Sequence, residues 1–256
     1  MNIKRLGASV AALALLATAG CGSGGTATPE LTKANFASEV SQAQVKAETA
    51  HVDAKIGAQG QNMSMTGDMD MTKKDVAFDF TMSGAALGNG ARFILVDKVV
   101  YLKVPQLTQS EKYVKVDTAD GSDPMAKMFT QMLSQMNPSR TFEAFDAITK
   151  LEDKGTQEVD GVETTRYAVT VDTKKALEAQ GLAGKVPTGQ LPKTLKYDVW
   201  VDADKLVRKL SMDVAGSTID MTLSEWGEPV QISAPPANQT TTMEKLMGQM
   251  GGGATG

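Results

Sequence analysis

Alternation of apolar and polar residues with a period of two runs through most of this chain, and it constrains the fold more than any other feature. Phe78, Phe80 and Met82, for example, are separated by Asp79 and Thr81. Such alternation is typical of antiparallel strands that bury one face and expose the other. We predict strands at 52–58, 62–71, 76–82, 91–96, 99–104, 112–117, 148–158, 164–171, 194–201, 206–214 and 218–226.

Turn and cap residues separate these strands. Asp97-Lys98 and Asp160-Gly161 are typical of tight hairpin turns. Asp123-Pro124 and Asn137-Pro138 each offer an N-cap followed by proline at the first helical position. Thr32 is the expected N-cap of a helix near the start of the folded part. The predicted helices lie at 32–50, 124–136, 138–148 and 173–180.

The number of strands also predicts a shape. A twisted antiparallel sheet of about ten or eleven strands tends to curl. We therefore predict a single α+β domain with a large, strongly curved antiparallel sheet, a half-barrel, whose concave face is covered by helices. Something apolar has to fill that concave face.

Methionine is unusually common, with 15 residues against 7 phenylalanines. Met63, Met65, Met69 and Met71 are all odd-numbered, so a single strand at 62–71 places them on one face. Gly67 lies between them and is suited to a bend or to the close approach of a ligand.

A second methionine group has the spacing of a helix. Met125, Met128, Met132 and Met136 recur at intervals of three and four residues and share one face of the helix expected at 124–136. They are either ordinary core residues or the lining of a cavity, because flexible methionine suits variable apolar partners such as acyl chains. The residues predicted to line such a lipid cavity are Met63, Met65, Met69, Met71, Phe78, Phe80, Met82, Met125, Met128, Phe129, Met132, Leu133 and Met136.

Copper binding and catalysis are further hypotheses. Thioethers are soft ligands for Cu(I), and 63–65 and 69–71 are Met-x-Met pairs. However, His51 is the only histidine, and acylation of Cys21 would leave no free thiol. The sequence has no Gly-x-Ser-x-Gly nucleophile motif, no zinc-ligand spacing and no phosphate-binding loop. We predict no enzyme, no cofactor and no resident metal.

The first residues have the layout of a bacterial lipoprotein signal. Lys4-Arg5 precede the apolar run 6–17, which is too short to span a bilayer, and Thr18-Ala19-Gly20-Cys21 follows. Thr18 departs from the pattern, which usually has Leu, Val or Ile there. The resemblance implies removal of residues 1–20 and acylation of Cys21. It places the protein at the cell membrane, lipid-anchored on the extracytoplasmic face.

Composition fits this location. Residues 21–30 are rich in glycine and small polar residues, which is typical of a flexible tether. Because Cys21 is the only cysteine, the fold has no disulfide and depends on packing. Removal of Lys4 and Arg5 leaves 24 basic and 30 acidic residues, a net charge near −6. That charge argues against a nucleic-acid partner and against electrostatic adhesion to a surface of anionic lipid, so the anchor has to hold the chain at the membrane.

Several motifs, taken in order along the chain, resemble the LppX/LprG group of actinobacterial lipoproteins. The similarity covers most of residues 31–237. The motifs are Val159-Asp160-Gly161-Val162 leading to Tyr167, Tyr197-Asp198-Val199-Trp200-Val201-Asp202 continuing to Leu206-Val207-Arg208-Lys209-Leu210, and Trp226-Gly227-Glu228-Pro229-Val230 before Pro235-Pro236.

This family is similar in fold to the LolA/LolB carriers, whose curved sheet wraps helices over an apolar cavity. The resemblance implies that the protein binds acylated lipids or lipoglycans and carries them within the envelope, with an export protein as a further candidate partner. The alternative is an envelope sensor that binds a protein partner with the same fold. We expect a monomer with a single lipid-binding domain at 31–234 and a disordered tail at 235–256, in which 243–250 is a candidate short helix.

Overall fold

The computed structural model describes residues 30–58, 60–72, 76–88, 90–105, 110–135, 147–179, 181, 191–214 and 216–251. The chain falls into two compact units, Met1–Glu30 and Leu31–Gly256, and every element described below belongs to the second. The predicted signal, Cys21 and the tether up to residue 29 lie outside the described residues.

The second unit combines one large sheet with few helices, which confirms the α+β class. The strands are β1 (Thr49–Ala58), β2 (Gln61–Asp70), β3 (Ala77–Gly84), β4 (Ala91–Val96), β5 (Val99–Lys103), β6 (Tyr113–Asp117), β7 (Ile148–Val159), β8 (Val162–Asp172), β9 (Thr194–Asp202), β10 (Val207–Val214), β11 (Ser217–Ser224) and β12 (Thr240–Thr241). The described helices are α1 (Phe36–Ala47), α3 (Pro124–Gln135), α5 (Thr173–Ala179) and α6 (Met243–Gly251), with short 3-10 helices η1 (Ala85–Leu87) and η3 (Ala237–Gln239).

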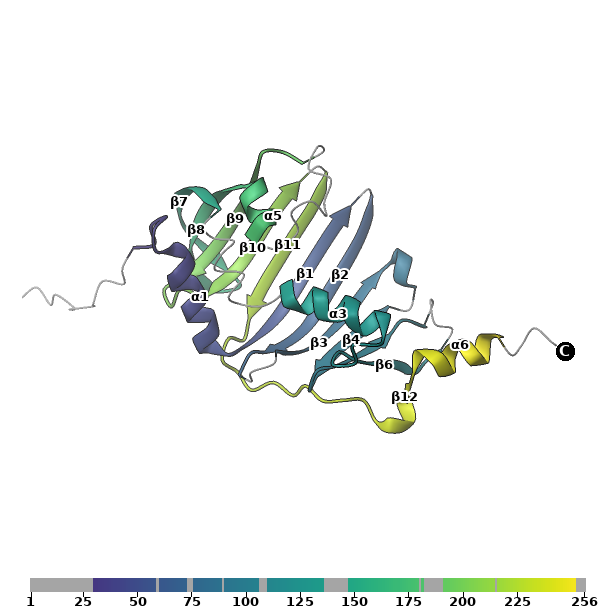
Figure 1. Ribbon diagram of the computed structural model, residues 1–256. Helices are drawn as coiled ribbons and strands as arrows, with labels where there is room; N and C mark the ends of the chain where they lie inside the picture. The colour runs from purple at the N-terminus through teal and green to yellow at the C-terminus, as the bar shows by residue number, and fades with distance from the viewer. Residues whose placement is uncertain are drawn as a thin grey trace, which may run out of the picture. The chain divides into compact units, whose positions relative to one another are not determined.

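All twelve strands form a single sheet in the order β12-β6-β5-β4-β3-β2-β1-β11-β10-β9-β8-β7. Neighbours are antiparallel except β12 and β6, which are parallel. β1 joins two runs of consecutive strands, because it pairs with β2 on one side and β11 on the other. The edge strands β7 and β12 do not pair with each other, so the sheet is twisted and curved but not closed (Figure 1).

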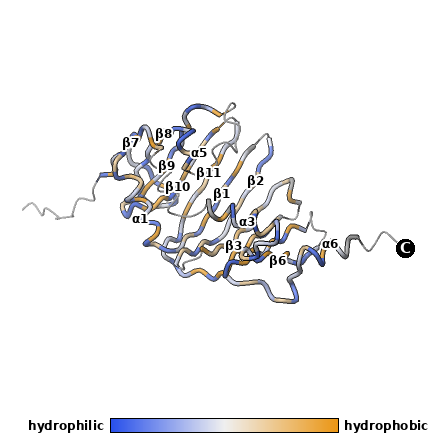
Figure 2. Tube along the Cα trace, viewed as in Figure 1, coloured by the Kyte–Doolittle hydropathy of each residue, from blue (hydrophilic) through white to orange (hydrophobic). Residues whose placement is uncertain are grey.

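One face of the sheet, here called the inner face, carries a continuous apolar layer. Val52 of β1 lies opposite Leu223 of β11 and opposite Gly67 of β2, which in turn lies opposite Phe80 of β3. Figure 2 shows the change between hydrophobic and hydrophilic residues along the strands. The buried members that the strands contribute to the core are Val52, Phe78, Phe80, Leu95, Val100, Val114, Val116, Ile148, Tyr167, Val169, Val171, Val199, Val201, Val207 and Leu223.

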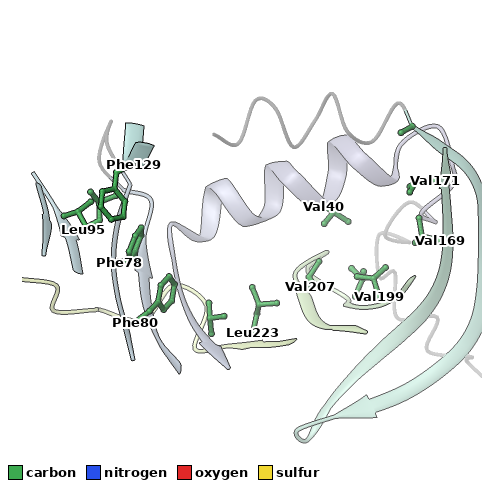
Figure 3. Close-up of a cluster of buried hydrophobic side chains, with 14 of the residues drawn as sticks. Val40, Phe78, Phe80, Leu95, Phe129, Val169, Val171, Val199, Val207 and Leu223 are labelled. Carbon is green, nitrogen blue, oxygen red and sulfur yellow. The ribbon is translucent and has the colours of Figure 1, made fainter. Parts of the chain in front are cut away.

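Helices cover parts of the inner face. Phe36 and Val40 of α1 are buried in the same cluster, and the ring of Phe36 meets Tyr167 edge-on at 5.5 Å. Phe129 of α3 is buried near Phe78 and Leu95, at the other end of the cluster (Figure 3). The two helices therefore lie over different parts of one continuous core.

The outer face of the sheet is largely polar. Arg92 and Asp79 form a two-pronged ion pair, with Nε–Oδ1 and Nη2–Oδ2 distances of 2.8 and 2.6 Å. The Trp200 ring lies under two cations, Arg166 at 5.3 Å and Lys209 at 5.0 Å. The exception is a small apolar cluster near β6 that packs against Ile232 and consists of Ile94, Val96, Tyr101 and Tyr113.

The edge strand β7 is irregular. Its pairing with β8 shifts register between Ile148 and Lys150 and again between Asp153 and Thr156. Gly155 in the second irregularity has a φ of 87°, in the left-handed region that favours glycine. Two β-bulges therefore interrupt this edge.

The predicted turns are confirmed by the backbone. Asp97 and Lys98 have φ of 51° and 64°, and Asp160 and Gly161 have φ of 48° and 81°. Two successive residues with positive φ match the right-handed twist of the flanking strands. The cap of α3 is confirmed as well, because the backbone N–H of Met125 donates to Asp123 Oδ1 at 2.7 Å.

The start of the first predicted helix needs correction. The first helix starts at Phe36, because Asn35 and Phe36 donate their backbone N–H groups to the carbonyl of Thr32 in a preceding turn. Thr32 is therefore not the N-cap. The helix predicted at 138–148 falls mostly on residues 136–146, outside the described residues, and Ile148 already belongs to β7.

The tail predicted to be disordered from residue 235 contains secondary structure as far as residue 251. β12 adds the twelfth strand by pairing with Tyr113 and Val114 of β6. α6 confirms the candidate helix, and its Leu246 is buried in the core while Met243 packs against it. Burial of these two side chains stabilises the segment.

Gly67 provides a test of the sheet geometry. A Cβ at this position would lie 2.0 Å from the carbonyl oxygen of Asp79 on β3, and φ is 154°. The close approach is thus made by a neighbouring strand. We expect Gly67→Ala to destabilise the domain by more than about 1 kcal/mol in urea unfolding.

The matched control is Gly121→Ala, because a Cβ at Gly121 meets nothing within 4 Å. We expect this variant to change the free energy of unfolding by less than about 0.5 kcal/mol. Equal stability of the two variants would contradict the close packing of β2 against β3.

Candidate functional site

The centre of the inner face is where two methionines of β2 meet two aromatic residues of β3. Met69 lies opposite Phe78, and Met65 lies four residues earlier in β2, on the same face. The rings of Phe78 and Phe80 stack at 5.0 Å. Both phenylalanines are buried in the core cluster, and both methionines pack against it partly buried. The structure thus brings four of the predicted cavity residues together.

Helix α3 contributes a second group to this centre. Ala126 and Phe129 are buried in the core cluster, and Met125 and Leu133 pack against it. These side chains form a stripe along one side of the helix, as their spacing requires. Met125, Phe129 and Leu133 therefore lie on the buried side of α3.

Met128 does not share this position. Its exposed fraction is 56%, the higher of the two large exposed hydrophobic residues in the described chain. Met128 is about 100° from Phe129 around the helix, so burial of Phe129 turns it toward solvent. The prediction that the methionines share an inward face is thus wrong for Met128. The Met132 side chain and Met136 lie outside the described residues.

The remaining predicted residues lie at the margin of the core. Met82 is half-buried opposite Met65. Met71 is half-buried just after β2, where its backbone N–H donates to the carbonyl of Glu48. Met63 is half-buried near the start of β2, opposite Ile56 and Gly84.

Met63 belongs to a row of paired side chains that crosses the sheet. We call the row, which runs from β2 through β1, β11 and β10 to β9, the inner row. Its members are directly opposite one another in register and all half-buried, and they are Met63, Ile56, Ile219, Met212 and Tyr197. Among the described residues, the core and the side chains packed on it include Tyr197 but not the other four.

Of the inner row, only Met63 was among the residues predicted from the sequence to line a cavity. Ile56, Ile219 and Met212 each lie in a predicted alternating segment, so the alternation placed each on the apolar face of its strand. The pairing of β1 with β11 connects residues far apart in the sequence, which local patterns do not reveal. The sequence did offer one signal. The alternation that places the methionines of β2 on one face could have been followed in the other strands of the sheet.

Charged groups form ion pairs near the inner face, beside the first turn of α1. Glu39 of α1 forms an ion pair with Lys205 in the β9–β10 turn. Asp202 accepts hydrogen bonds from Arg208 Nε at 2.6 Å and from the backbone N–H groups of Asp204 and Leu206 at 2.9 Å each. These contacts confirm the interpretation of 202–204 as a turn and fix α1 against β9 and β10.

His51 lies outside this apolar centre, in β1. Its Nδ1 donates to Asp68 Oδ1 at 2.6 Å, and Nε2 lies 3.3 Å from Thr66 Oγ1. Asp68 is the main cause of a raised His51 pKa, partly opposed by burial, with smaller contributions from Asp53 and Glu225. Among the described residues, His, Cys, Asp and Glu form no group of three that could hold a metal.

Comparisons with known proteins identify the family. Residues 32–232 match the family described as LppX_LprAFG lipoprotein. The chain belongs to this family. It is also 28% identical over 239 residues to the lipoarabinomannan carrier protein LprG of Mycobacteroides abscessus, an alignment that covers 91% of this chain and 98% of that protein.

Solved structures of LppX_LprAFG proteins share the fold. The lipoprotein LppX of Mycobacterium tuberculosis is 16% identical, with a TM-score of 0.53, and the alignment covers 79% of this chain and all of LppX. LprF of Mycobacterium bovis is also 16% identical, with a TM-score of 0.56 and coverage of 80% and 97%. The family inferred from the sequence motifs is thereby confirmed, and so is the large curved sheet.

This protein is therefore a member of a lipoprotein family, and its relative LprG is a lipoarabinomannan carrier. Within the described residues, the helices are all too short or too polar to cross a membrane.

The His51–Asp68 pair generates a pH prediction. His51 is the only histidine, so one imidazole signal reports its titration by NMR. We expect a midpoint above 6.5, and a lower midpoint in Asp68→Asn because the main cause of the raised pKa is removed. The stability that the pair provides is fully present below pH 6.5 and is lost as the pH rises through the folded-state pKa.

Asp120→Asn, in an exposed turn after β6, is the control and should leave the His51 midpoint unchanged. An unchanged midpoint in Asp68→Asn would show that the hydrogen bond does not set this pKa.

Proposed function

We propose that this protein is a membrane-anchored carrier that holds the acyl chains of a lipid or lipoglycan against the inner face of its sheet. In this proposal it moves its ligand within the cell envelope and catalyses no reaction. The similarity to LprG, a lipoarabinomannan carrier, supports the ligand class.

The inner row carries the proposal. It places half-buried apolar side chains side by side across five strands, on the same face as the closed core. An acyl chain along the row would complete the burial of these side chains. At about 0.8 kcal/mol per methylene, a chain of about 16 carbons gains roughly 12 kcal/mol before ordering costs.

The anchor is proposed to be Cys21. The lipoprotein family and the motif that ends in Thr18-Ala19-Gly20-Cys21 support acylation at this residue. A thioether-linked diacylglycerol supplies two chains, which suffices for stable anchoring. The domain would then stay close to the extracytoplasmic face of the cell membrane, from which it can take its ligand.

Release requires the apolar face to open, because burial on this scale makes spontaneous loss slow. We propose that α3 is the moving part and that residues 120–122 are its hinge. The hinge is a short turn in which Ser122 donates from its backbone N–H and its hydroxyl to Asp120 Oδ1, at 2.8 and 2.6 Å. A Cβ at Gly121 would meet nothing within 4 Å, so the turn has room to change conformation.

Lipid content tests the proposal. Residues 22–256, which include the whole compact unit, are expressed in a related actinobacterium, and organic extracts of the purified protein are examined by mass spectrometry. We expect acylated lipid in the extract. Met63→Lys should retain at least about tenfold less, because its ammonium group would have to be buried against the ligand.

Asn62→Lys is the matched control, because Asn62 is the exposed neighbour of Met63 on the other face of β2. It should retain as much lipid as the natural sequence. Protein that is empty and takes up no added phospholipid or glycolipid would refute the carrier and favour an envelope sensor. Stoichiometric Cu(I) in such empty protein would instead favour the Met-x-Met sites, and a hydrolase activity lost in His51→Ala would favour an enzyme.

A further inference from the structure

Tyr197 is the polar member of the inner row. It lies in β9, opposite Met212 of β10 and Val169 of β8, and its side chain packs against the core cluster. The other members of the row offer no hydrogen-bond donor, because a methionine thioether is only a weak acceptor. The phenol hydroxyl is therefore the one group through which the row itself could recognise a polar atom.

This hydroxyl has no hydrogen-bond partner among the described residues, in contrast to the polar groups of the two tryptophans and of Tyr113. The indole N–H of Trp200 donates to Gln157 Oε1 at 2.6 Å, and that of Trp226 donates to the carbonyl of Val207 at 3.0 Å. The Tyr113 hydroxyl accepts a hydrogen bond from Arg92. Burial alone raises the pKa of Tyr197 to about 12, so the phenol is largely, though not completely, shielded from water as well as unpaired.

A shielded hydroxyl without a partner is unfavourable, and proteins rarely retain one without a reason. Among the described residues, Arg166 Nε is the side-chain atom that is both fully buried and without a hydrogen-bond partner. The Tyr197 hydroxyl also lacks a partner, so it is not fully buried. A ligand group can thus reach Tyr197 and accept its proton. The acceptor has to belong to a molecule that is otherwise apolar, because the rest of the row is apolar.

An ester carbonyl, where an acyl chain meets its headgroup, has these properties. The inner row spans four strand spacings from Tyr197 to Met63, which is about 19 Å at roughly 4.8 Å per spacing. The hydrocarbon chains of one leaflet extend about 15 Å, half of a core that is about 30 Å thick. An acyl chain that lies along the row with its ester at Tyr197 therefore reaches to within about one strand spacing of Met63.

We propose that the Tyr197 hydroxyl donates a hydrogen bond to the ester carbonyl of the bound lipid and so sets the position of the chain along the inner row. This inference rests on the proposed carrier function. It makes the ligand an acyl ester and makes Tyr197 a specificity-determining residue that favours ester-linked over ether-linked chains.

The test compares two probes that differ only in their two ester carbonyls, dipalmitoyl phosphatidylglycerol and its dihexadecyl ether analogue. Both are titrated against delipidated residues 22–256. We expect about fivefold tighter binding of the ester, the size of one hydrogen bond. In Tyr197→Phe this preference should disappear while the ether binds as before. Tyr101→Phe, which removes a hydroxyl from the apolar cluster of the outer face, should keep the preference.

Infrared spectra of bound ester labelled with carbon-13 at the carbonyl give a second readout. We expect the carbonyl band at lower frequency in the natural sequence than in Tyr197→Phe, and thermal unfolding confirms that the variant is folded. Equal binding of ester and ether, or a preference that persists in Tyr197→Phe, would overturn the role of Tyr197 and leave the carrier function standing. Binding of neither probe, with no lipid in the extracts, would overturn both.

Discussion

A sheet that is apolar on one face has to cover that face, and the rest of this domain depends on how it does so. α1 and α3 bring Phe36, Val40 and Phe129 onto the inner face and bury its central layer. The inner row stays half-buried beside that layer. The fold is therefore stabilised by its core while a second apolar surface remains to be covered by something else. That division is what makes a protein of this kind suited to an apolar ligand.

Local patterns predicted most of the fold because each strand shows its alternation within its own segment. The hairpin at Asp160-Gly161 and the cap at Asp123 are equally local, and both are present in the structure. β12 could not be predicted in this way, because two residues cannot show a period. The first helix is shorter than its pattern because Thr49 and Ala50 pair with β2, and tertiary pairing overrides helical spacing.

The candidate site was less accessible from sequence. Strand parity placed Met65 and Met69 correctly with Phe78, because side-chain direction in a strand follows from parity alone. The orientation of a helix around its axis is not fixed in this way. Phe129 and Ala126 determine which side of α3 is buried, and Met128 is exposed as a result. The inner row depends on the register between β1 and β11, which forms only in the folded chain.

The irregular edge strand β7 has a consequence for solubility. An unclosed sheet offers unpaired backbone groups at its edges, and a second molecule can add to them. On β7, two register shifts and the turn at Gly155 break the regular spacing of those groups. Glu152 also forms ion pairs with Lys150 at 3.0 Å and Lys154 at 3.7 Å, which place charges along the edge. The unclosed sheet is therefore protected from edge-to-edge aggregation along β7.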